Sequence, residues 1–285
     1  MERLRGLVEL TRPGNALLSG LLTFIGAFVA GLGGGPAGLL VATAPELRAG
    51  AAVVATVLAV GAGNAINDYF DREIDRINAP DRPIPRGAVS PRGALVFAVA
   101  LFGGAVAMAL LLPPLAIGIA VVNLFALVAY TELFKGLPGV GNALVGYLGG
   151  STFLFGGVAV GGRLRPVVVL FVLAALATFA REVVKDVEDV AGDREEGLNT
   201  LPIAYGERAA LVTAAVALAF AVLASPAPYL LGTFGVAYLA AVLPADAVML
   251  AAGYWSFDDA TRGQTWLKYG QLLAALAFVV GRIAV

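Results

Sequence analysis

The sequence predicts an all-α, polytopic membrane protein built as one domain, residues 1–285. Of the 285 residues, 59% are hydrophobic, and the mean hydropathy of +0.87 is far above that of a water-soluble domain. About 20 apolar residues can cross a bilayer as a helix, and stretches of that length recur along the chain. Two charged stretches, residues 68–92 and 185–208, interrupt the pattern. We expect transmembrane helices around a central chamber, capped by short helices from these two stretches.

Nine spans are predicted from the apolar runs and the Gly- and Pro-rich breaks between them. Residues 1–135 and 136–252 form two predicted halves of four spans, each with a charged stretch after its second span, and residues 267–285 close the bundle against lipid. The eighth span contains Pro244, where we expect a kink. The predicted spans are 15–32, 47–67, 93–112, 115–134, 140–160, 167–184, 209–224, from 225–228 to 252, and 267–285.

The positions of Arg and Lys predict how the chain is oriented. If the N-terminus is cytoplasmic, most of these residues lie on the cytoplasmic side, as the positive-inside rule requires. Arg48, Arg163, Arg165 and Arg282 are the exceptions. We therefore expect a multi-pass protein of the cell membrane, with both charged stretches facing the cytoplasm.

Composition removes several kinds of chemistry. The chain has no cysteine and no histidine, so a thiolate metal site, a cysteine nucleophile, a Ser-His-Asp triad and a histidine-ligated zinc are excluded. The formal net charge of −1 does not identify a partner. We expect the bilayer and lipid substrates as partners, with no nucleic acid and no obligate protein partner.

Two clusters of carboxylates share one spacing. Asp68, Asp71 and Asp75 are separated by three and then four residues, and the spacing recurs in a second triplet. On a helix such residues lie close together, and like charges this close need a positive partner. Ligands that are all oxygen favour a hard cation, of which Mg²⁺ is the best match. The second triplet is Asp186, Asp189 and Asp193.

The chemistry expected of such a cation involves phosphate. Mg²⁺ held by a few carboxylates completes its coordination with phosphate oxygens, and the nearby Arg and Lys side chains can bind the same phosphates. At a membrane surface this combination indicates a lipid diphosphate or a lipid with a phosphate headgroup. The competing interpretation is that both stretches are ordinary solvated loops.

Several segments resemble one known family. The segment N-D-Y-F-D-R-E-I-D at 67–75 resembles the first aspartate motif of the UbiA superfamily of intramembrane prenyltransferases, and D-V-A-G-D at 189–193 resembles the second. The segments 11–15, 78–87 and 197–206 match further parts of the family. Residues 185–203 are most similar to the archaeal branch that builds ether lipids, so the resemblance covers nearly the whole chain.

This resemblance implies an activity. A geranylgeranyl group would pass from geranylgeranyl diphosphate to the hydroxyl of geranylgeranylglyceryl phosphate, forming the second ether bond of archaeal membrane lipids. Two Mg²⁺ ions would bridge the diphosphate, held by Asn67, Asp71, Asp189 and Asp193, with Asp75 and Asp186 as further ligands or supporting groups. The resemblance assigns catalytic roles to Asp68, Asp71, Asp189 and Asp193.

Substrate binding is predicted for a set of polar residues near the two motifs. For the arginines of the set, membrane anchoring is the alternative to phosphate binding, and for Lys185 the alternative is an ion pair with Asp186. Relatives often carry Y-x-x-x-K at the end of the fourth span, whereas Tyr130 and Lys135 are one residue further apart. The set is Arg12, Asn15, Asn64, Arg82, Arg86, Tyr130, Lys135 and Lys185.

Three other functions compete with this one. A UbiA-type enzyme could instead use an aromatic or porphyrin acceptor. A cation transporter would place its acidic groups near the middle of the bilayer, whereas both clusters lie at span ends. A CDP-alcohol phosphotransferase requires D-x-x-D-G-x-x-A-R, which this sequence lacks. Asp246, alone within the eighth span, is either functional or held by a neighbouring polar group.

Overall fold

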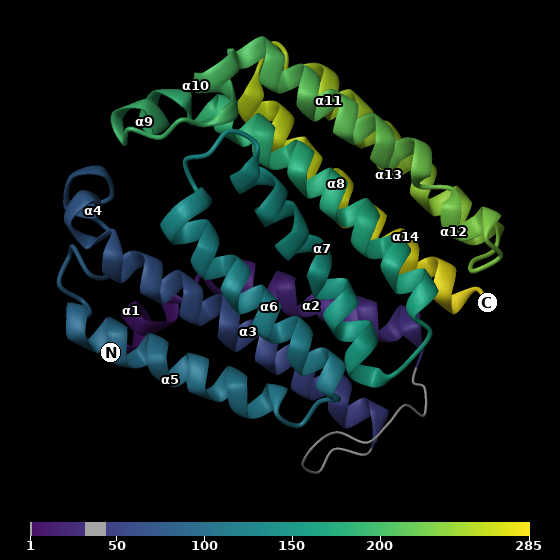
Figure 1. Ribbon diagram of the computed structural model, residues 1–285, viewed down its shortest axis with the longest axis horizontal. Helices are drawn as coiled ribbons and strands as arrows, with labels where there is room; N and C mark the ends of the chain where they lie inside the picture. Colours follow the sequence, from purple (N-terminus) through teal and green to yellow (C-terminus); the bar gives the residue numbers. More distant parts are fainter. Residues whose placement is uncertain (1, 32–43) are drawn as a thin grey trace.

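A computed structural model describes residues 2–31 and 44–285, and all regular structure in these ranges is helical (Figure 1). Prolines at the first turn begin α2, α3, α5 and α6, where the missing N–H costs no helical hydrogen bond. The helices are α1 (Glu2–Leu10), α2 (Pro13–Ala30), α3 (Pro45–Phe70), α4 (Arg72–Asn78), α5 (Pro91–Ala109), α6 (Pro114–Ala129), the π-helix η1 (Tyr130–Phe134), α7 (Val140–Val160), α8 (Leu164–Glu188), α9 (Val190–Glu195), α10 (Leu201–Tyr205), α11 (Glu207–Ala224), α12 (Ala227–Leu230), α13 (Val236–Trp255) and α14 (Ala260–Ile283).

The predicted spans correspond to the long helices. Within the described ranges, 7 helical segments are long and apolar enough to cross a membrane: α2, α3, α5, α7, α8, α11 with α12, and α13. The helix α6 is apolar but shorter, and α14 contains Arg262, Lys268 and Arg282. The all-α membrane fold is therefore confirmed, whereas the count of nine spans and the division into two halves stay predictions.

One predicted boundary is wrong. We expected the eighth span to begin at 225–228, but those residues belong to the end of α11 and the short helix α12. Turns near Gly232, which has a positive φ of 66°, separate α12 from α13. Pro226 and Pro228 lack the backbone N–H that a continuing helix needs. They therefore favour the start of a new short helix over a span that runs through 225–228. Pro244 lies inside α13 without ending it.

Glycines let α2 and α7 approach closely. A Cβ atom added at Gly26 would lie 2.1 Å from the carbonyl oxygen of Phe153, and one at Gly156 would lie 1.9 Å from that of Thr23. A backbone carbonyl cannot rotate away from such a clash, so only glycine fits at either crossing position. The helices α2 and α7, which belong to different predicted halves of the chain, therefore pack with their backbones in contact.

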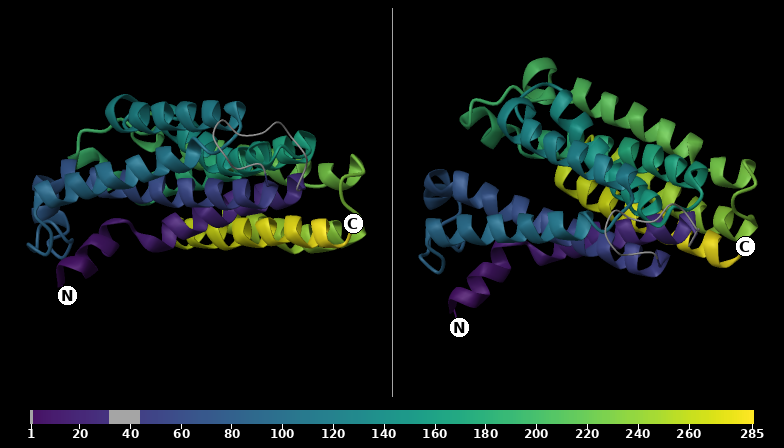
Figure 2. Two further views of the ribbon diagram at one scale, coloured as in Figure 1. Left: turned by 90° about the horizontal axis from the view of Figure 1, so that it is seen from below. Right: turned by 60° about the horizontal axis from the view of Figure 1, so that its bottom comes forward.

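Both charged stretches lie at the same end of the helical bundle. The helix α4 follows α3, and α9 follows α8, and Figure 1 shows α4 and α9 at the left of the molecule, beyond the ends of the long helices. In Figure 2, α1 projects from that same end and carries the N-terminus. The expectation that these stretches form short helices is confirmed. The fold thus brings together two acidic clusters that are far apart in the sequence.

Candidate functional site

Arginines hold two carboxylates of the first cluster, where α3 ends and α4 begins. Asp68 in α3 and Asp75 in α4 are 4% and 5% exposed. Arg12 donates to Asp68 Oδ1 over 2.7 Å, and Arg82 Nη1 lies 2.6 Å from Asp75 Oδ2 and 3.6 Å from Asp68 Oδ1. A buried carboxylate without a partner would be strongly destabilising, so the two arginines stabilise the fold by pairing with both acids.

The backbone at Arg12 is strained in a way that suits this contact. Its φ of 46° lies in the left-handed region, which residues other than glycine seldom adopt. Arg12 stands between α1 and Pro13, the first residue of α2, so the turn occurs where the two helices change direction. Strain of this kind persists only when the surroundings compensate for it, and the ion pair with buried Asp68 is one such compensation.

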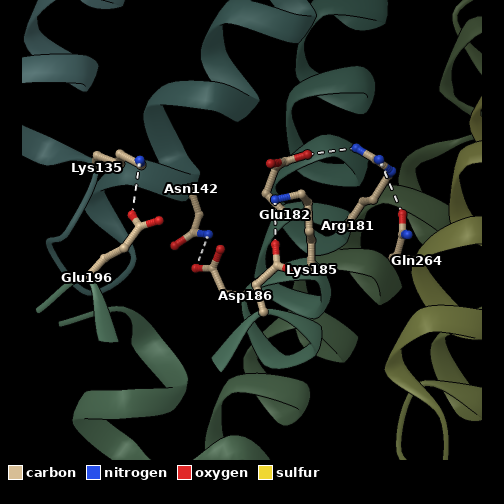
Figure 3. A network of polar contacts seen from close by, with 9 residues as sticks. Lys135, Asn142, Arg181, Glu182, Lys185, Asp186, Glu196 and Gln264 are labelled. Carbon is tan, nitrogen blue, oxygen red and sulfur yellow. Dashed lines mark hydrogen bonds and ion pairs between the residues drawn. The ribbon is translucent and has the colours of Figure 1, made fainter. Parts of the chain in front are cut away.

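The second cluster is held by an amide and a lysine. Asn142 Nδ2 on α7 donates to Asp186 Oδ2 on α8 over 2.7 Å, and Lys185 Nζ lies 2.8 Å from Asp189 Oδ2 (Figure 3). The expected ion pair of Lys185 with Asp186 is therefore wrong. Asp189 lies one helical turn after Lys185 and on its side of α8, whereas adjacent residues point in different directions. Both side chains of this pair are 46% exposed, unlike the buried pairs of the first cluster.

Lys135 faces acidic groups from both charged stretches. Its Nζ is 3.5 Å from Glu196 Oε2 in the second charged stretch (Figure 3), and its charge also acts on Asp71 of the first cluster. A backbone hydrogen bond from Asn199 to the carbonyl of Gly136, 3.1 Å long, ties the second stretch to the residue after Lys135. One lysine ammonium thus faces carboxylates from both halves of the sequence.

A π-helical turn explains the unusual spacing of Tyr130 and Lys135. The turn η1 spans Tyr130–Phe134, and the N–H of Lys135 donates to the carbonyl of Tyr130 over 2.8 Å, five residues back and not four. A π-helical turn accommodates one residue more than an α-helical turn. The extra residue therefore lies inside the turn, and Lys135 still follows Tyr130 by one helical turn. Tyr130 interacts electrostatically with Asp186 and Asp193 of the second cluster.

Asp71, Asp186 and Asp193 form no ion pair among the described residues, and of these Asp186 accepts a hydrogen bond from Asn142. Burial raises the pKa of Asp71 above its ordinary value of 3.8, and the charges of Asp75 and Glu196 add to this effect, whereas that of Lys135 opposes it. Burial also raises the pKa of Asp193, with a further contribution from Asp189. An additional cation near either carboxylate would favour its ionised form.

The donor set of the two clusters fits a hard divalent cation. Aspartate and asparagine oxygens from α3, α4, α8 and α9 are the ligand types that Mg²⁺ prefers, and an added cation would favour the ionised forms of Asp71 and Asp193. Within residues 2–31 and 44–285, no three acidic side chains converge closely enough to hold a metal ion. Three of the aspartates instead form ion pairs with basic side chains of the protein: Asp68 with Arg12, Asp75 with Arg82, and Asp189 with Lys185.

The remaining predicted binding residues have different surroundings. Asn64 Nδ2 donates to the carbonyl of Thr11 over 2.9 Å and thereby anchors the start of α2 to α3. Arg86 forms an ion pair with Glu9 of α1. Asn15 lies in the first turn of α2 with an exposed side chain. These contacts stabilise the entrance of the site, and binding roles for the three residues stay predictions.

Sequence reasoning missed several polar residues that belong to this region. Asn142, in an otherwise apolar span, could have been found because a polar side chain in a transmembrane helix usually has a function. Glu196 gave no signal beyond its place in a charged stretch. Arg181 Nη1 pairs with Glu182 at 2.7 Å and its Nη2 contacts Gln264 of α14 at 3.3 Å (Figure 3), so α14 also reaches this end of the bundle.

Comparisons with known proteins identify the family of this chain. The profile of the UbiA prenyltransferase family matches residues 19–279. The chain belongs to the UbiA prenyltransferase family. The resemblance seen in the two aspartate motifs is thereby confirmed, and the chain is a prenyltransferase of the membrane-embedded kind.

Individual relatives match this UbiA protein over nearly its full length. It is 67% identical to the digeranylgeranylglyceryl phosphate synthase of Natronomonas pharaonis, covering 100% of this chain and 99% of that protein. The enzyme of the same name from Halobacterium salinarum is 61% identical, with 99% of each chain covered. The same name is carried by a Methanopyrus kandleri protein that is 47% identical, covering 97% of this chain and 98% of that protein.

Solved structures show the same fold. A structure described as giving insight into digeranylgeranylglyceryl phosphate synthase in membranes is 34% identical, with a TM-score of 0.83 and complete coverage of both chains. A UbiA homologue from Archaeoglobus fulgidus, bound to GPP and Mg²⁺, is 19% identical with a TM-score of 0.69, covering 100% of this chain and 99% of that one. The UbiA fold therefore extends over the whole molecule.

Proposed function

We propose that this UbiA protein is a digeranylgeranylglyceryl phosphate synthase. It transfers a geranylgeranyl group from geranylgeranyl diphosphate to the free hydroxyl of geranylgeranylglyceryl phosphate. The bond between the allylic carbon and the diphosphate oxygen breaks, a carbon–oxygen ether bond forms, and the hydroxyl loses its proton. Full-length relatives with this enzyme name support the choice of acceptor, and the placement of both acidic stretches at one end of the bundle, with Lys135 facing Glu196 and Asp71, supports the chemistry.

Two Mg²⁺ ions would bind at the two clusters. Asn67, Asp71, Asp189 and Asp193 are the proposed ligands. Asp68 and Asp75 are already held by buried pairs with arginines and Asp186 by Asn142, whereas the half-exposed pair of Asp189 with Lys185 would open when the ion binds. When bound, the ions offset the negative charge that develops on the departing diphosphate. The A. fulgidus homologue holds GPP and Mg²⁺, which supports this assignment at the level of the fold.

The chain's own residues position these ligands and hold the diphosphate. Arg12 pairs with Asp68, and Arg82 with both Asp68 and Asp75, which fixes the end of α3 relative to α4. The ammonium group of Lys135 pairs with Glu196 and acts on Asp71, and it can donate to a diphosphate oxygen bound beside them. The apolar spans behind the clusters exclude water from the allylic cation, which water would otherwise capture.

The active site would face the cytoplasm. Most arginines and lysines lie at the end of the bundle that carries α4 and α9, and positively charged loops are typical of the cytoplasmic side. In this orientation the soluble part of each substrate, its phosphate, would reach the site from the cytoplasm. The N-terminus lies at the same end (Figure 2).

A competition between acceptors tests the proposal. The purified protein would receive geranylgeranyl diphosphate and Mg²⁺ together with geranylgeranylglyceryl phosphate and 4-hydroxybenzoate, and mass spectrometry would identify the products. We expect the diether phosphate, and no product in excess EDTA. A prenylated aromatic product would keep the prenyltransferase class but move the enzyme to another acceptor. Full activity in EDTA would contradict the metal assignment.

A further inference from the structure

A second polar site lies deep among the helices, away from the acidic clusters. A cavity of about 100 Å³ is lined by α7, α8, α11, α13 and α14, with Leu22 of α2. Figure 1 shows α8, α11, α13 and α14 side by side on the right of the molecule. Thr178 on the cavity wall precedes Asp186 on α8 by about eight residues, or roughly 12 Å at 1.5 Å per residue. The cavity is therefore deeper in the bundle than the site of prenyl transfer.

One wall of this cavity is polar. Ser225 Oγ donates to Asp246 Oδ2 over 2.5 Å, and the hydroxyl of Tyr238 donates to the carbonyl of Ser225 over 2.7 Å. Asp246 is 5% exposed, and Ser225 binds only one of its two carboxyl oxygens. The sequence expectation that a neighbouring polar group holds Asp246 is therefore met in part. The other carboxyl oxygen, Oδ1, and the side-chain nitrogen of Gln271 on α14 are buried, and neither has a hydrogen-bond partner within the described residues.

These two atoms are complementary. Asp246 Oδ1 can accept a hydrogen bond, and Gln271 Nε2 can donate one. Leaving either unpaired in the interior of a membrane protein is costly, and an acidic residue within a span marks a functional site more often than a structural one. Among the described residues that line the cavity there is no lysine or arginine that could pair with Asp246.

The rest of the wall is apolar and limits what can occupy the cavity. Phe153, Phe278, Leu173 and Met249 lie opposite or beside the polar groups. A water molecule needs two to four polar partners, so one water could be satisfied at Asp246 and Gln271 but a cluster filling 100 Å³ could not. An occupant with one hydroxyl group and an apolar body matches both parts of the wall.

We propose that the cavity binds the hydroxyl end of an apolar alcohol taken from the bilayer. Asp246 Oδ1 accepts the O–H of the ligand, Gln271 Nε2 donates to the same oxygen, and the hydrocarbon lies against the aromatic rings. This site requires neither metal nor diphosphate, and it does not depend on the acceptor proposed for the enzyme.

The test uses the full-length protein in lipid nanodiscs with a photoreactive diazirine analogue of a long-chain primary alcohol. Labelled peptides are located by mass spectrometry, with 1-octanol or octyl methyl ether as competitor. We expect labelling on α8, α13 and α14. The ether should compete about fivefold less well, because it cannot donate to Asp246 and one net hydrogen bond contributes about that factor.

Variants separate recognition from partitioning into lipid. In Asp246→Leu the preference for the alcohol over the ether should disappear, and Gln271→Leu should weaken competition by both compounds. Asp258→Asn, which changes an exposed acid between α13 and α14, should behave like the wild type. Equal competition by alcohol and ether in the wild type, or labelling confined to other helices, would overturn the proposal. If Asp246→Leu does not fold, Gln271→Leu provides the decisive comparison.

Discussion

The two acidic clusters have the same spacing but are neutralised differently. In the first, Asp68 and Asp75 are buried and paired with Arg12 and Arg82, and the middle carboxylate, Asp71, has no ion pair within the described residues. In the second, the ion pair is more exposed. Asp186 accepts a hydrogen bond from an amide, Asp189 pairs with Lys185, and the last carboxylate, Asp193, has no ion pair in the described chain.

This difference teaches that spacing alone does not assign roles to aspartates. Equivalent positions in the two triplets have different partners, because the partners come from loops and helices that are not repeated in the sequence: the turn before α2, the loop after α4, and α7. Each cluster nevertheless contains at least one carboxylate without an ion pair among the described residues. The paired aspartates of the first cluster are buried, and that of the second is half-exposed.

The largest effect should come from the two unpaired carboxylates. In Asp71→Asn or Asp193→Asn the loss of a metal ligand should reduce kcat by about a thousandfold, a typical cost for removing electrostatic stabilisation at the reacting centre. The neutral amide retains the shape, so thermal stability should change little. Steady-state rates of the purified variants test this, with Asp258→Asn as control. Wild-type rates in either variant would remove that residue from the metal site.

The two clusters should differ strongly in what their cations contribute to stability. Arg82→Gln leaves two buried carboxylates with one fewer partner and should lower the free energy of unfolding by about 2 kcal/mol, below the usual cost of breaking a buried pair because Arg82 is 37% exposed. Lys185→Gln breaks a half-exposed pair and should cost less than about 1 kcal/mol. Thermal unfolding in one detergent compares them. Equal losses would contradict the proposed difference between the clusters.

Lys135 should affect substrate affinity more than turnover. In Lys135→Gln the ammonium that faces Glu196 and Asp71 is lost, and KM for geranylgeranyl diphosphate should rise about tenfold, equivalent to one charge-assisted hydrogen bond. The KM for the acceptor should stay constant. Lys268→Gln, at an exposed position on α14, is the matched control. A rise in both KM values would indicate that Lys135 supports the whole site and not the donor alone.

The smallest effect concerns pH. Because burial raises the pKa of Asp71 and Asp193 above 3.8, protons compete with a metal at higher pH than they would at an ordinary aspartate. The apparent Kd for Mg²⁺ should therefore rise severalfold as the pH falls toward the raised pKa values of these carboxylates, and it should be constant well above them. Calorimetric titration measures it, and Asp193→Asn should flatten the profile. A Kd independent of pH would show that neither carboxylate binds the metal.

The sequence predicted the fold well where apolar length determines structure. The span 140–160 coincides with α7, and most other spans match their helices to within a few residues at each end. The start of the eighth span was wrong because periodic hydrophobicity does not distinguish a short helix with a turn from the beginning of a long helix. The placement of both acidic clusters at one end followed from the even number of spans predicted between them.

The site was less accessible to sequence reasoning. The residue types and spacing indicated the aspartates, but their partners depend on contacts between distant segments, such as that between Asn142 and Asp186. The pairing of Lys185 with Asp189 and not Asp186 was predictable from helical geometry, since residues four apart share a face. The position of Glu196 near Lys135 was not, because it depends on how the loop after α9 folds back.

Because of the π-helical turn at η1, a one-residue deletion should be tolerated within this turn but not earlier in α6. Each residue added to an α-helix rotates everything after it by about 100°. Deleting one residue within 131–133 would convert η1 to an ordinary turn and leave Lys135 on the same side of the helix as Tyr130. A deletion earlier in α6 would instead rotate Tyr130 and Lys135 together, so that both side chains would point away from the two clusters. Natural relatives that differ in length here can therefore keep the same lysine in the same place.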